Sequence, residues 1–369
     1  MAPKDKKLIG AWLIIGVIMV FIQVLIGGIT RLTGSGLSIT RWEVVTGTIP
    51  PLDETAWQAE FNLYKQSPQF KKINHQMTLP EFKGIYFWEY FHRLWARTLG
   101  FVFLIPFAWF VFKKKIRGAL LKKAVIAFLL GGLVGIFGWI MVASGLSDRP
   151  MVSPYKLAIH LSLAIITLGY LLWVALDLLV LKEKAVDASL KKSALWLTGL
   201  VSFQIVLGAI VSGMRAAFFF PTWPDMNGTF IPDILLQTEF WSWNAFIHFE
   251  KFGLAPALFQ FLHRNTAYII AIWTAVLIFK SFKNYPAFKN LFLVLGGLIL
   301  TQVALGIFTL IGSIGTIPVA LGVAHQGVGI LTLMWLLVLN YKFSGEKAVF
   351  KTAPEIAFKR EKLSVANRF

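Results

Sequence analysis

Residues 124–143 read AVIAFLLGGLVGIFGWIMVA, twenty residues in a row without a charged side chain. An α-helix needs about 20 mostly apolar residues to cross the hydrocarbon core of a bilayer. Lipid offers no hydrogen bonds to an exposed backbone, whereas a helix satisfies its own backbone groups within one segment. This stretch therefore predicts a membrane-spanning helix.

Seven more apolar runs of similar length lie on either side of it. The chain has 369 residues, of which 57% are hydrophobic and 15% charged, and this composition lies outside the range of soluble domains. The runs are also too long and too uniformly apolar for the strands of a membrane barrel. We predict an all-α polytopic membrane protein with eight transmembrane helices at 8–29, 88–112, 124–143, 157–181, 194–213, 256–279, 291–312 and 319–341.

The net charge of +18 is spread unevenly along the chain. Most of the excess Lys and Arg lies at the amino terminus, in the second, fourth and sixth loops between spans, and in the carboxyl tail. The positive-inside rule assigns these segments to the cytoplasm. We therefore expect a multi-pass protein of a bacterial cytoplasmic membrane, with both termini cytoplasmic and the long loops 30–87 and 214–255 on the outer face. The apolar spans make a lipid bilayer the partner of the chain. The position of the basic charge in the loops and tails implies no nucleic-acid partner.

The absence of cysteine narrows the chemistry. It excludes disulfides, metals held by thiolates and a cysteine nucleophile, and it leaves histidine as the remaining soft metal ligand. The first apolar run follows Lys4, Lys6 and Lys7 but has no small-residue cleavage pattern, so we interpret it as a retained span and not as a removed signal.

The chain repeats itself. Residues of the first span and the loop after it recur at one constant separation, and the histidines of the even-numbered spans recur in the same order. We predict two halves, 1–185 and 186–369, each a four-helix bundle, related by a pseudo-twofold axis along the membrane normal. The recurring residues are Gln23, Gly27, Trp42, Gly47, Thr48 and Pro51 with Gln204, Gly208, Trp223, Gly228, Thr229 and Pro232, then His92–Arg93 with His263–Arg264, and Gly131, Gly132, Leu133 and His160 with Gly296, Gly297, Leu298 and His325.

Four of the six histidines are repeat partners: His92, His160, His263 and His325. Each lies near the predicted start of an even-numbered span, and all these spans begin on the outer face. Two imidazoles on facing helices are a common way to hold haem iron, so we predict that His92 pairs with His160 and His263 with His325. Interhelical hydrogen bonding is the alternative for any single membrane histidine. Zinc is less favoured, because two histidines leave half of a tetrahedral shell unfilled.

The halves differ beside the first histidine of each pair. Glu89 stands three residues before His92, whereas Gln260 stands at the same place before His263. Residues three apart share a helix face, and a carboxylate within a membrane span is usually functional. We favour a catalytic Glu89 over a water-binding or hydrogen-bonding one, which makes the amino-terminal half the reacting site. Five arginines near the outer boundary are candidate partners of anionic haem propionates: Arg31, Arg93, Arg97, Arg215 and Arg264.

Three segments resemble the haem A synthase family: ITRLTGSGLS at 29–38, EYFHRLWAR at 89–97 and AHQGVG at 324–329. The resemblance covers nearly all eight helices. It implies conversion of haem O to haem A, in which a porphyrin methyl group becomes a formyl group for use by haem-copper terminal oxidases. It also implies that His263 and His325 ligate a haem b cofactor, that His92 and His160 flank haem O, and that Glu89 assists the oxidation.

The resemblance is to the cysteine-free branch of the family, similar to mitochondrial-type members, because some bacterial members carry a cysteine pair in the outer loops. It implies haem O handed over by a haem O synthase and an electron donor that the sequence does not identify. Small-residue helix faces permit a homo-oligomer. The sequence also leaves open whether His92 or His160 leaves the iron to admit oxygen, or whether water supplies the oxygen atom.

Two other functions fit parts of the sequence. A di-haem membrane cytochrome that only transfers electrons would need the four histidines but not Glu89. A transporter with a parallel repeat would place its binding site near the bilayer midplane, among broken helices, whereas the four histidines lie off the midplane. We therefore rank the cytochrome second and the transporter third.

Overall fold

The computed structural model of the chain describes residues 1–41, 46–147, 149–182 and 187–345. Trp42 of the repeat lies outside them. The described residues form helices and no strand, and eight of the helices are long and apolar enough to cross a membrane. The predicted all-α fold with eight spans is confirmed. The spans are α1 (Pro3–Leu32), α4 (Leu79–Phe112), α5 (Gly118–Leu146), α6 (Pro154–Leu179), α7 (Ala188–Gly213), α10 (Leu254–Asn284), α11 (Lys289–Ile311) and α12 (Val319–Phe343).

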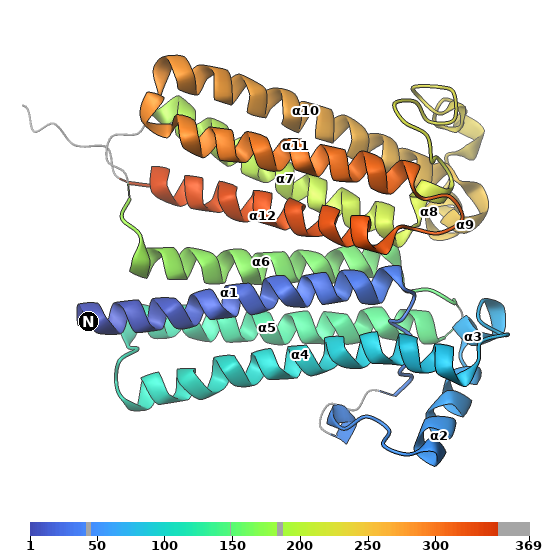
Figure 1. Cartoon of the computed structure of the whole chain (residues 1–369). Helices are drawn as coiled ribbons and strands as arrows, with labels where there is room; N and C mark the ends of the chain where they lie inside the picture. Colours follow the sequence, from blue (N-terminus) through green and yellow to red (C-terminus); the bar gives the residue numbers. More distant parts are fainter. Residues whose placement is uncertain (42–45, 148, 183–186, 346–369) are drawn as a thin grey trace, which may run out of the picture.

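The shorter helices lie in the connections between the spans. In Figure 1, α2 and α3 lie at the end of the molecule opposite the amino terminus, together with α8 and α9. These elements are η1 (Thr46–Thr48), α2 (Glu54–Lys65), α3 (Pro68–Lys72), η2 (Ala216–Phe218), η3 (Asp233–Leu235), η4 (Thr238–Phe240), α8 (Trp243–Ile247), α9 (Phe249–Phe252) and η5 (Pro286–Phe288).

One predicted boundary is clearly wrong. Helix α4 begins at Leu79 and not near residue 88, because Thr78 and Glu81 form a capping box and Pro80 occupies the first turn. These start signals are polar, so a search for apolar runs passes over them. As a result His92 lies well inside its helix, whereas the predicted boundary places it within the first turns.

The division into halves 1–185 and 186–369 stays a prediction, and the spans make contacts both within and between these halves. Helix α1 packs against α4 and α6, and α5 packs against α6; in the second half α7 packs against α10 and α12, and α11 against both of these. The halves meet where α6 contacts α7 and where α12 contacts α1 and α6. One difference stands out: α4 makes few contacts with α5, whereas α10 packs closely on α11. The pseudo-twofold axis stays a prediction.

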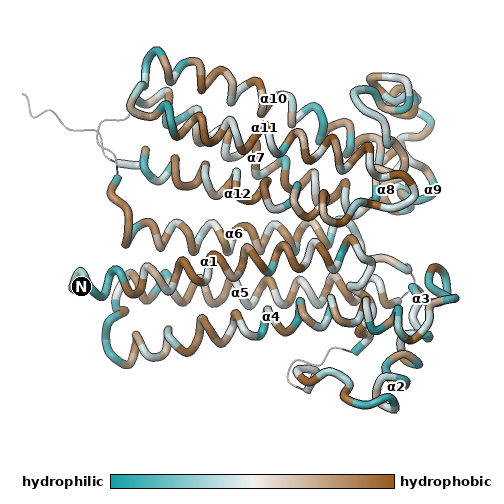
Figure 2. The backbone as a smooth tube through the Cα atoms, viewed as in Figure 1, coloured by the Kyte–Doolittle hydropathy of each residue, from teal (hydrophilic) through white to brown (hydrophobic). Residues whose placement is uncertain are grey.

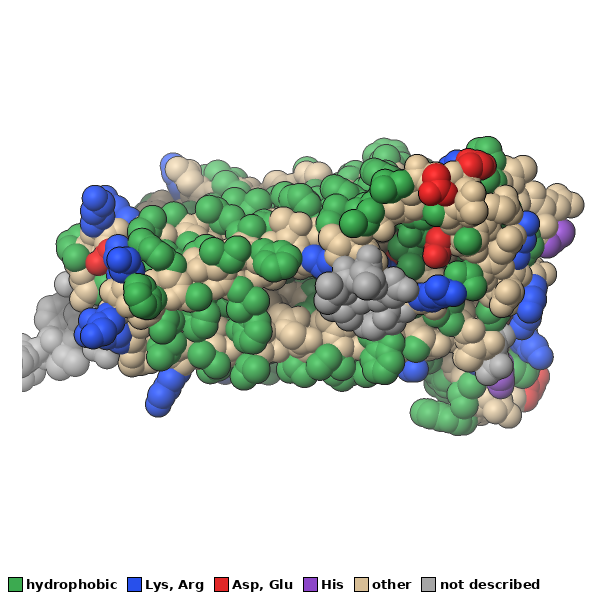
Figure 3. Space-filling view, turned by 90° about the horizontal axis from the view of Figure 1, so that it is seen from below, with side chains coloured by type: hydrophobic (Ala, Val, Ile, Leu, Met, Phe, Trp, Pro, Cys, Tyr) green, Lys and Arg blue, Asp and Glu red, His purple; other side chains and the backbone are tan. Residues whose placement is uncertain are grey.

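The apolar surface agrees with a membrane setting. Figure 2 shows hydrophobic residues along the middle of the long helices and hydrophilic ones gathered mainly at the two ends. In Figure 3 most of the Lys and Arg side chains lie near the ends of the visible face, with a hydrophobic band between them. Large side chains such as Phe101, Ile105 and Ile272 are more than half exposed, as expected of residues that face lipid.

Arg31 connects the two halves at the end of the molecule opposite the amino terminus. Its Nη2 donates to the main-chain oxygens of Ser212 and Gly213, both at 3.0 Å, and so joins the end of α1 to the end of α7. These carbonyls belong to the last turn of α7, where helical partners run out, and the Ser212 oxygen also accepts from the Arg215 N–H at 3.1 Å. A cation at a helix C-terminus is also favourable for the helix dipole.

We predict that Arg31→Met lowers the thermal stability of the detergent-solubilised protein, because it removes two charge-assisted hydrogen bonds worth about 2 kcal/mol or more together. Arg41→Met is the matched control, since the Arg41 side chain is exposed. Melting curves followed by intrinsic tryptophan fluorescence measure the difference. Equal melting temperatures for the two variants would contradict the role given to Arg31.

Candidate haem-binding site

Each of the four repeat histidines packs against a glycine of a neighbouring odd-numbered span. A Cβ atom placed on that glycine would lie about 3 Å from the imidazole Cε1, closer than real Cβ contacts normally allow. The ring therefore rests on bare helix backbone. The pairs and the Cβ to Cε1 distances are Gly27–His92 at 3.0 Å, Gly138–His160 at 2.9 Å, Gly208–His263 at 3.1 Å and Gly306–His325 at 2.8 Å.

In the second histidine of each pair the ring is also fixed by a hydrogen bond. The Nδ1 of His160 lies 3.0 Å from the Val134 oxygen, and the Nδ1 of His325 lies 3.1 Å from the Gln302 oxygen. Val134 and Gln302 each stand four residues before the supporting glycine. A carbonyl can only accept, so Nδ1 carries the proton and Nε2 keeps its lone pair. This is the usual orientation of a metal-ligating histidine.

The first histidine of each pair is held differently, and alike in both halves. Gln23 Nε2 donates to the main-chain oxygen of His92 at 3.1 Å, and Gln204 Nε2 donates to that of His263 at 2.8 Å. These glutamines are repeat partners and again stand four residues before the supporting glycine. Gln23 Nε2 also lies 3.2 Å from both ring nitrogens of His92.

The geometry of the carboxyl-terminal pair fits an iron between two imidazoles. The ring centres of His263 and His325 are 6.3 Å apart and the rings are inclined at 75°. A metal bonded at about 2 Å to each nitrogen, with about 1 Å more from nitrogen to ring centre, needs a separation of this size. The Nδ1 of His263 is buried and has no hydrogen-bond partner among the described residues.

Among the residues that the structure describes, no three His, Cys, Asp or Glu side chains come together in a group that could hold a metal ion. A zinc site of the usual tetrahedral kind needs three or four such ligands. A porphyrin supplies four nitrogen ligands of its own and asks the protein for only two. The donor set present therefore suits haem iron.

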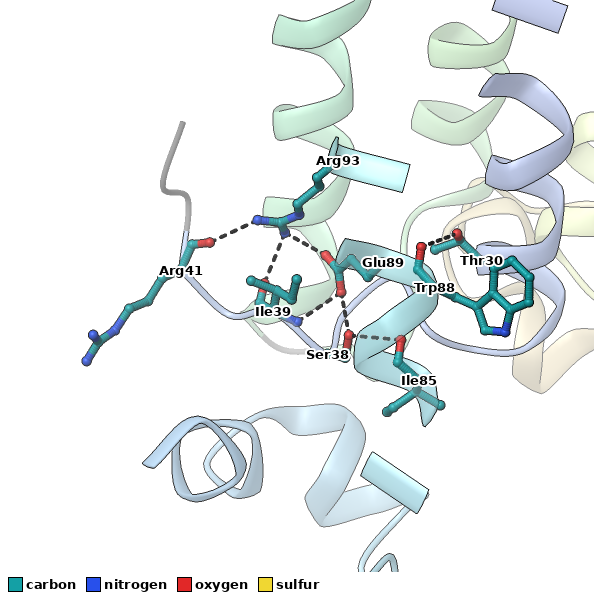
Figure 4. A network of polar contacts seen from close by, with 8 residues as sticks. All are labelled: Thr30, Ser38, Ile39, Arg41, Ile85, Trp88, Glu89 and Arg93. Carbon is teal, nitrogen blue, oxygen red and sulfur yellow. Dashed lines mark hydrogen bonds and ion pairs between the residues drawn. The ribbon is translucent and has the colours of Figure 1, made fainter. Parts of the chain in front are cut away.

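Glu89 lies at the centre of a polar network (Figure 4). Its side chain is only 3% exposed, and its carboxylate accepts hydrogen bonds from the Ser38 hydroxyl at 2.8 Å, the Ile39 N–H at 2.9 Å and the Arg93 guanidinium at 2.5 Å. Arg93 donates further to the Ile39 and Arg41 oxygens. The network ties the segment after α1 to α4, one turn from His92, and the catalytic role of Glu89 stays a prediction.

The second half has the same plan with a neutral side chain. Gln260, also 3% exposed, donates from Nε2 to the Phe220 oxygen at 2.9 Å. Arg264 donates to the oxygens of Phe220 and Asp225. Hydrogen bonds from the Thr222 hydroxyl and the Gly228 N–H lower the pKa of Asp225, which lies in the connection between α7 and α10. Only the amino-terminal half has a carboxylate at this position.

Three of the five arginines expected near haem propionates are engaged elsewhere. Arg31 donates to main-chain oxygens at the end of α7, Arg93 to one in the segment after α1, and Arg264 to one in the segment after α7. Sequence reasoning also missed Ser38, Gln302 and the contact of Gln23 with His92. The spacing of four residues between glutamine and glycine, repeated in α1, α7 and α11, was the available signal.

Comparison with known proteins decides the family. Residues 10–337 match the family described as cytochrome oxidase assembly protein. The chain belongs to this family. Proteins named heme A synthase are similar to it: that of Parvibaculum lavamentivorans is 42% identical over 86% of this chain and 89% of its own length, and that of Flavobacterium psychrophilum is 40% identical over 92% and 99%. A third, from Rhodospirillum centenum, is 42% identical over 90% and 87%.

Membership of the cytochrome oxidase assembly protein family confirms the resemblance inferred from the three sequence segments. The matched range begins within α1 and ends within α12, so it contains all four histidines and Glu89.

We predict that Gly306→Ala lowers the haem content of the purified protein, because the new methyl group would lie 2.8 Å from the His325 ring and force it away. Gly297→Ala on the same helix is the matched control, since nothing lies within 4 Å of its Cβ. Haem per polypeptide and the low-spin signal in electron paramagnetic resonance are the measurements. Full haem retention with an unchanged signal in Gly306→Ala would contradict the supporting role of the glycine.

Proposed function

We propose that this chain is a haem A synthase, which oxidises a porphyrin methyl group of haem O to a formyl group and gives haem A for haem-copper terminal oxidases. The observation that carries the proposal is the placement of the four histidines. They form two pairs, one in each group of four helices, and each imidazole packs against a glycine. The names and the extent of the similar proteins support the reaction.

In this proposal the two halves, 1–185 and 186–369, have different tasks. His263 and His325 hold haem b as a resident cofactor, and His92 and His160 hold haem O as substrate. When bound, haem b would supply one-electron transfer. Two differences between the halves support this assignment. Glu89 stands where the other half has the neutral Gln260, and the second histidine bonds to the Val134 oxygen in one half and to the Gln302 oxygen in the other.

Glu89 would then act on the substrate side of the molecule. Its carboxylate already gathers three hydrogen-bond donors, which hold it in one place beside the His92 turn of α4. A fixed carboxylate there can take up a proton from water, or from the substrate as its methyl group is oxidised. Ser38 and Arg93 would position it.

The chain would lie in the bacterial cytoplasmic membrane with both termini in the cytoplasm. The amino terminus and the end of α12 lie at the same end of the molecule, and the outer-loop helices lie at the other (Figure 1). The glycine-supported histidines and the Glu89 network would then lie toward the outer leaflet. A haem O synthase in the same membrane would be the source of substrate.

A di-haem cytochrome remains the second candidate function because the histidine surroundings of the two halves are so alike. Gln23 and Gln204 make the same contact, as do Arg93 and Arg264. An electron carrier would use two equivalent haem sites and would not modify either haem.

We predict that Glu89→Gln, expressed in cells that make haem O, reduces haem A and hydroxylated haem O in favour of unreacted haem O, because the proton acceptor is lost. Haem extraction and mass analysis measure this. Gln260→Glu is the control in the other half and should leave the product pattern unchanged. If parent and variant both carried two unmodified haem b groups, the synthase proposal would fail and the cytochrome would stand.

A further inference from the structure

The two histidine pairs are connected through one side chain that crosses between the halves. Gln326 follows His325 in α12 and donates from Nε2 to the Val24 oxygen of α1 at 3.0 Å. Its amide lies directly on Gly28, where an added Cβ would be 2.5 Å from Oε1. The fit leaves no room for any side chain at that position of α1.

The same turns of α1 also contact the other pair. Gln23, which adjoins Val24, places its Nε2 3.2 Å from the ring nitrogens of His92. Gly27, which adjoins Gly28, supports the His92 ring. A path from His325 to His92 therefore follows covalent bonds except at two places. These are the hydrogen bond from Gln326 to Val24, at 3.0 Å, and the contact of Gln23 with the His92 ring, at 3.2 Å.

The equivalent interface between the halves has no such connection. In the repeat, Leu161 after His160 corresponds to Gln326, and Ala209 of α7 corresponds to Gly28. Leu161 packs into the apolar cluster that contains Ala209. A leucine therefore satisfies the packing needs of this place in the fold. Within a membrane an amide is costly to bury, so packing alone does not explain the glutamine at position 326.

The geometry points to Gln326, Val24 and Gln23 as the route by which electrons pass from the cofactor site to the substrate site. This inference rests on the proposed function. His263 and His325 would hold the electron donor, and His92 and His160 would hold the acceptor. Transfer would proceed one electron at a time, with no bond made or broken. Leu161, the counterpart of Gln326, has no polar group that could make the same connection at the other interface.

The test compares the parent with Gln326→Leu, which introduces the residue that the other half uses. Full-length protein is prepared with haem b in the cofactor site and haem A in the substrate site. Haem A is chosen because its formyl group separates its absorption spectrum from that of haem b. In half-reduced samples a temperature jump shifts the electron distribution, and the relaxation rate measures transfer between the sites. Thr332→Val, which removes one hydrogen bond within α12, is the control.

We expect relaxation to slow several-fold in Gln326→Leu and not in Thr332→Val, with haem content and both reduction potentials unchanged. A purely structural role would change haem content or potentials and leave the rate in intact molecules as it was. The double variant Gln326→Leu with Gly28→Ala reproduces the packing of the other interface, so it supplies a folded sample if the single variant does not.

The outcomes separate this inference from the proposed function. If both haems bind and the leucine variants relax as fast as the parent, the route is wrong while the synthase stands. If the parent holds no haem at His92 and His160 under any loading, the two-site arrangement fails, and the route fails with it.

Discussion

The close approach of an imidazole ring to a bare helix backbone is the contact on which the rest of the site depends. A flat ring can lie within about 3 Å of the place that a Cβ atom would take only where that atom is absent, so each histidine requires a glycine on the facing helix. The contact also fixes the spacing of the helices, because a ring wedged on backbone sets how near two spans can come. Once Nδ1 or the main-chain oxygen of the histidine is engaged as well, the ring has little freedom to turn. Four histidine–glycine contacts of the same kind therefore form the two candidate sites.

Much of this could be predicted from the sequence, for physical reasons that are easy to state. The apolar runs predict the eight spans, because the composition of a segment decides whether it can cross a membrane. The internal repeat singles out four of the six histidines as partners. The beginning of α4 could not be found this way, because Thr78, Pro80 and Glu81 are polar start signals outside the apolar run. The partners of Glu89 were equally out of reach: Ser38 and Ile39 lie about fifty positions away, and only folding brings that segment to α4.

The duplication is also what makes the differences between the halves informative. Each position in one bundle has a counterpart in the other that serves as a reference for what the fold alone requires. Gln260 hydrogen-bonds the segment after α7, as Glu89 hydrogen-bonds the segment after α1. A polar side chain at this position is therefore part of the architecture, and only the negative charge of Glu89 is particular to the first half. Leu161 plays the same part for Gln326. A duplicated chain thus contains its own control for separating architecture from chemistry.

The sparse contact between α4 and α5, set against the close packing of α10 on α11, bears on how long each bundle keeps what it binds. A bound molecule that is enclosed on every side can dissociate only when the whole bundle opens. A molecule beside a weakly packed pair of helices can dissociate when those two helices separate. On the proposed function, the first half would exchange its bound haem more readily and the second half would retain its haem. In a detergent extract the haem of the second half would then be present at close to one per chain, and the haem of the first half at a smaller fraction.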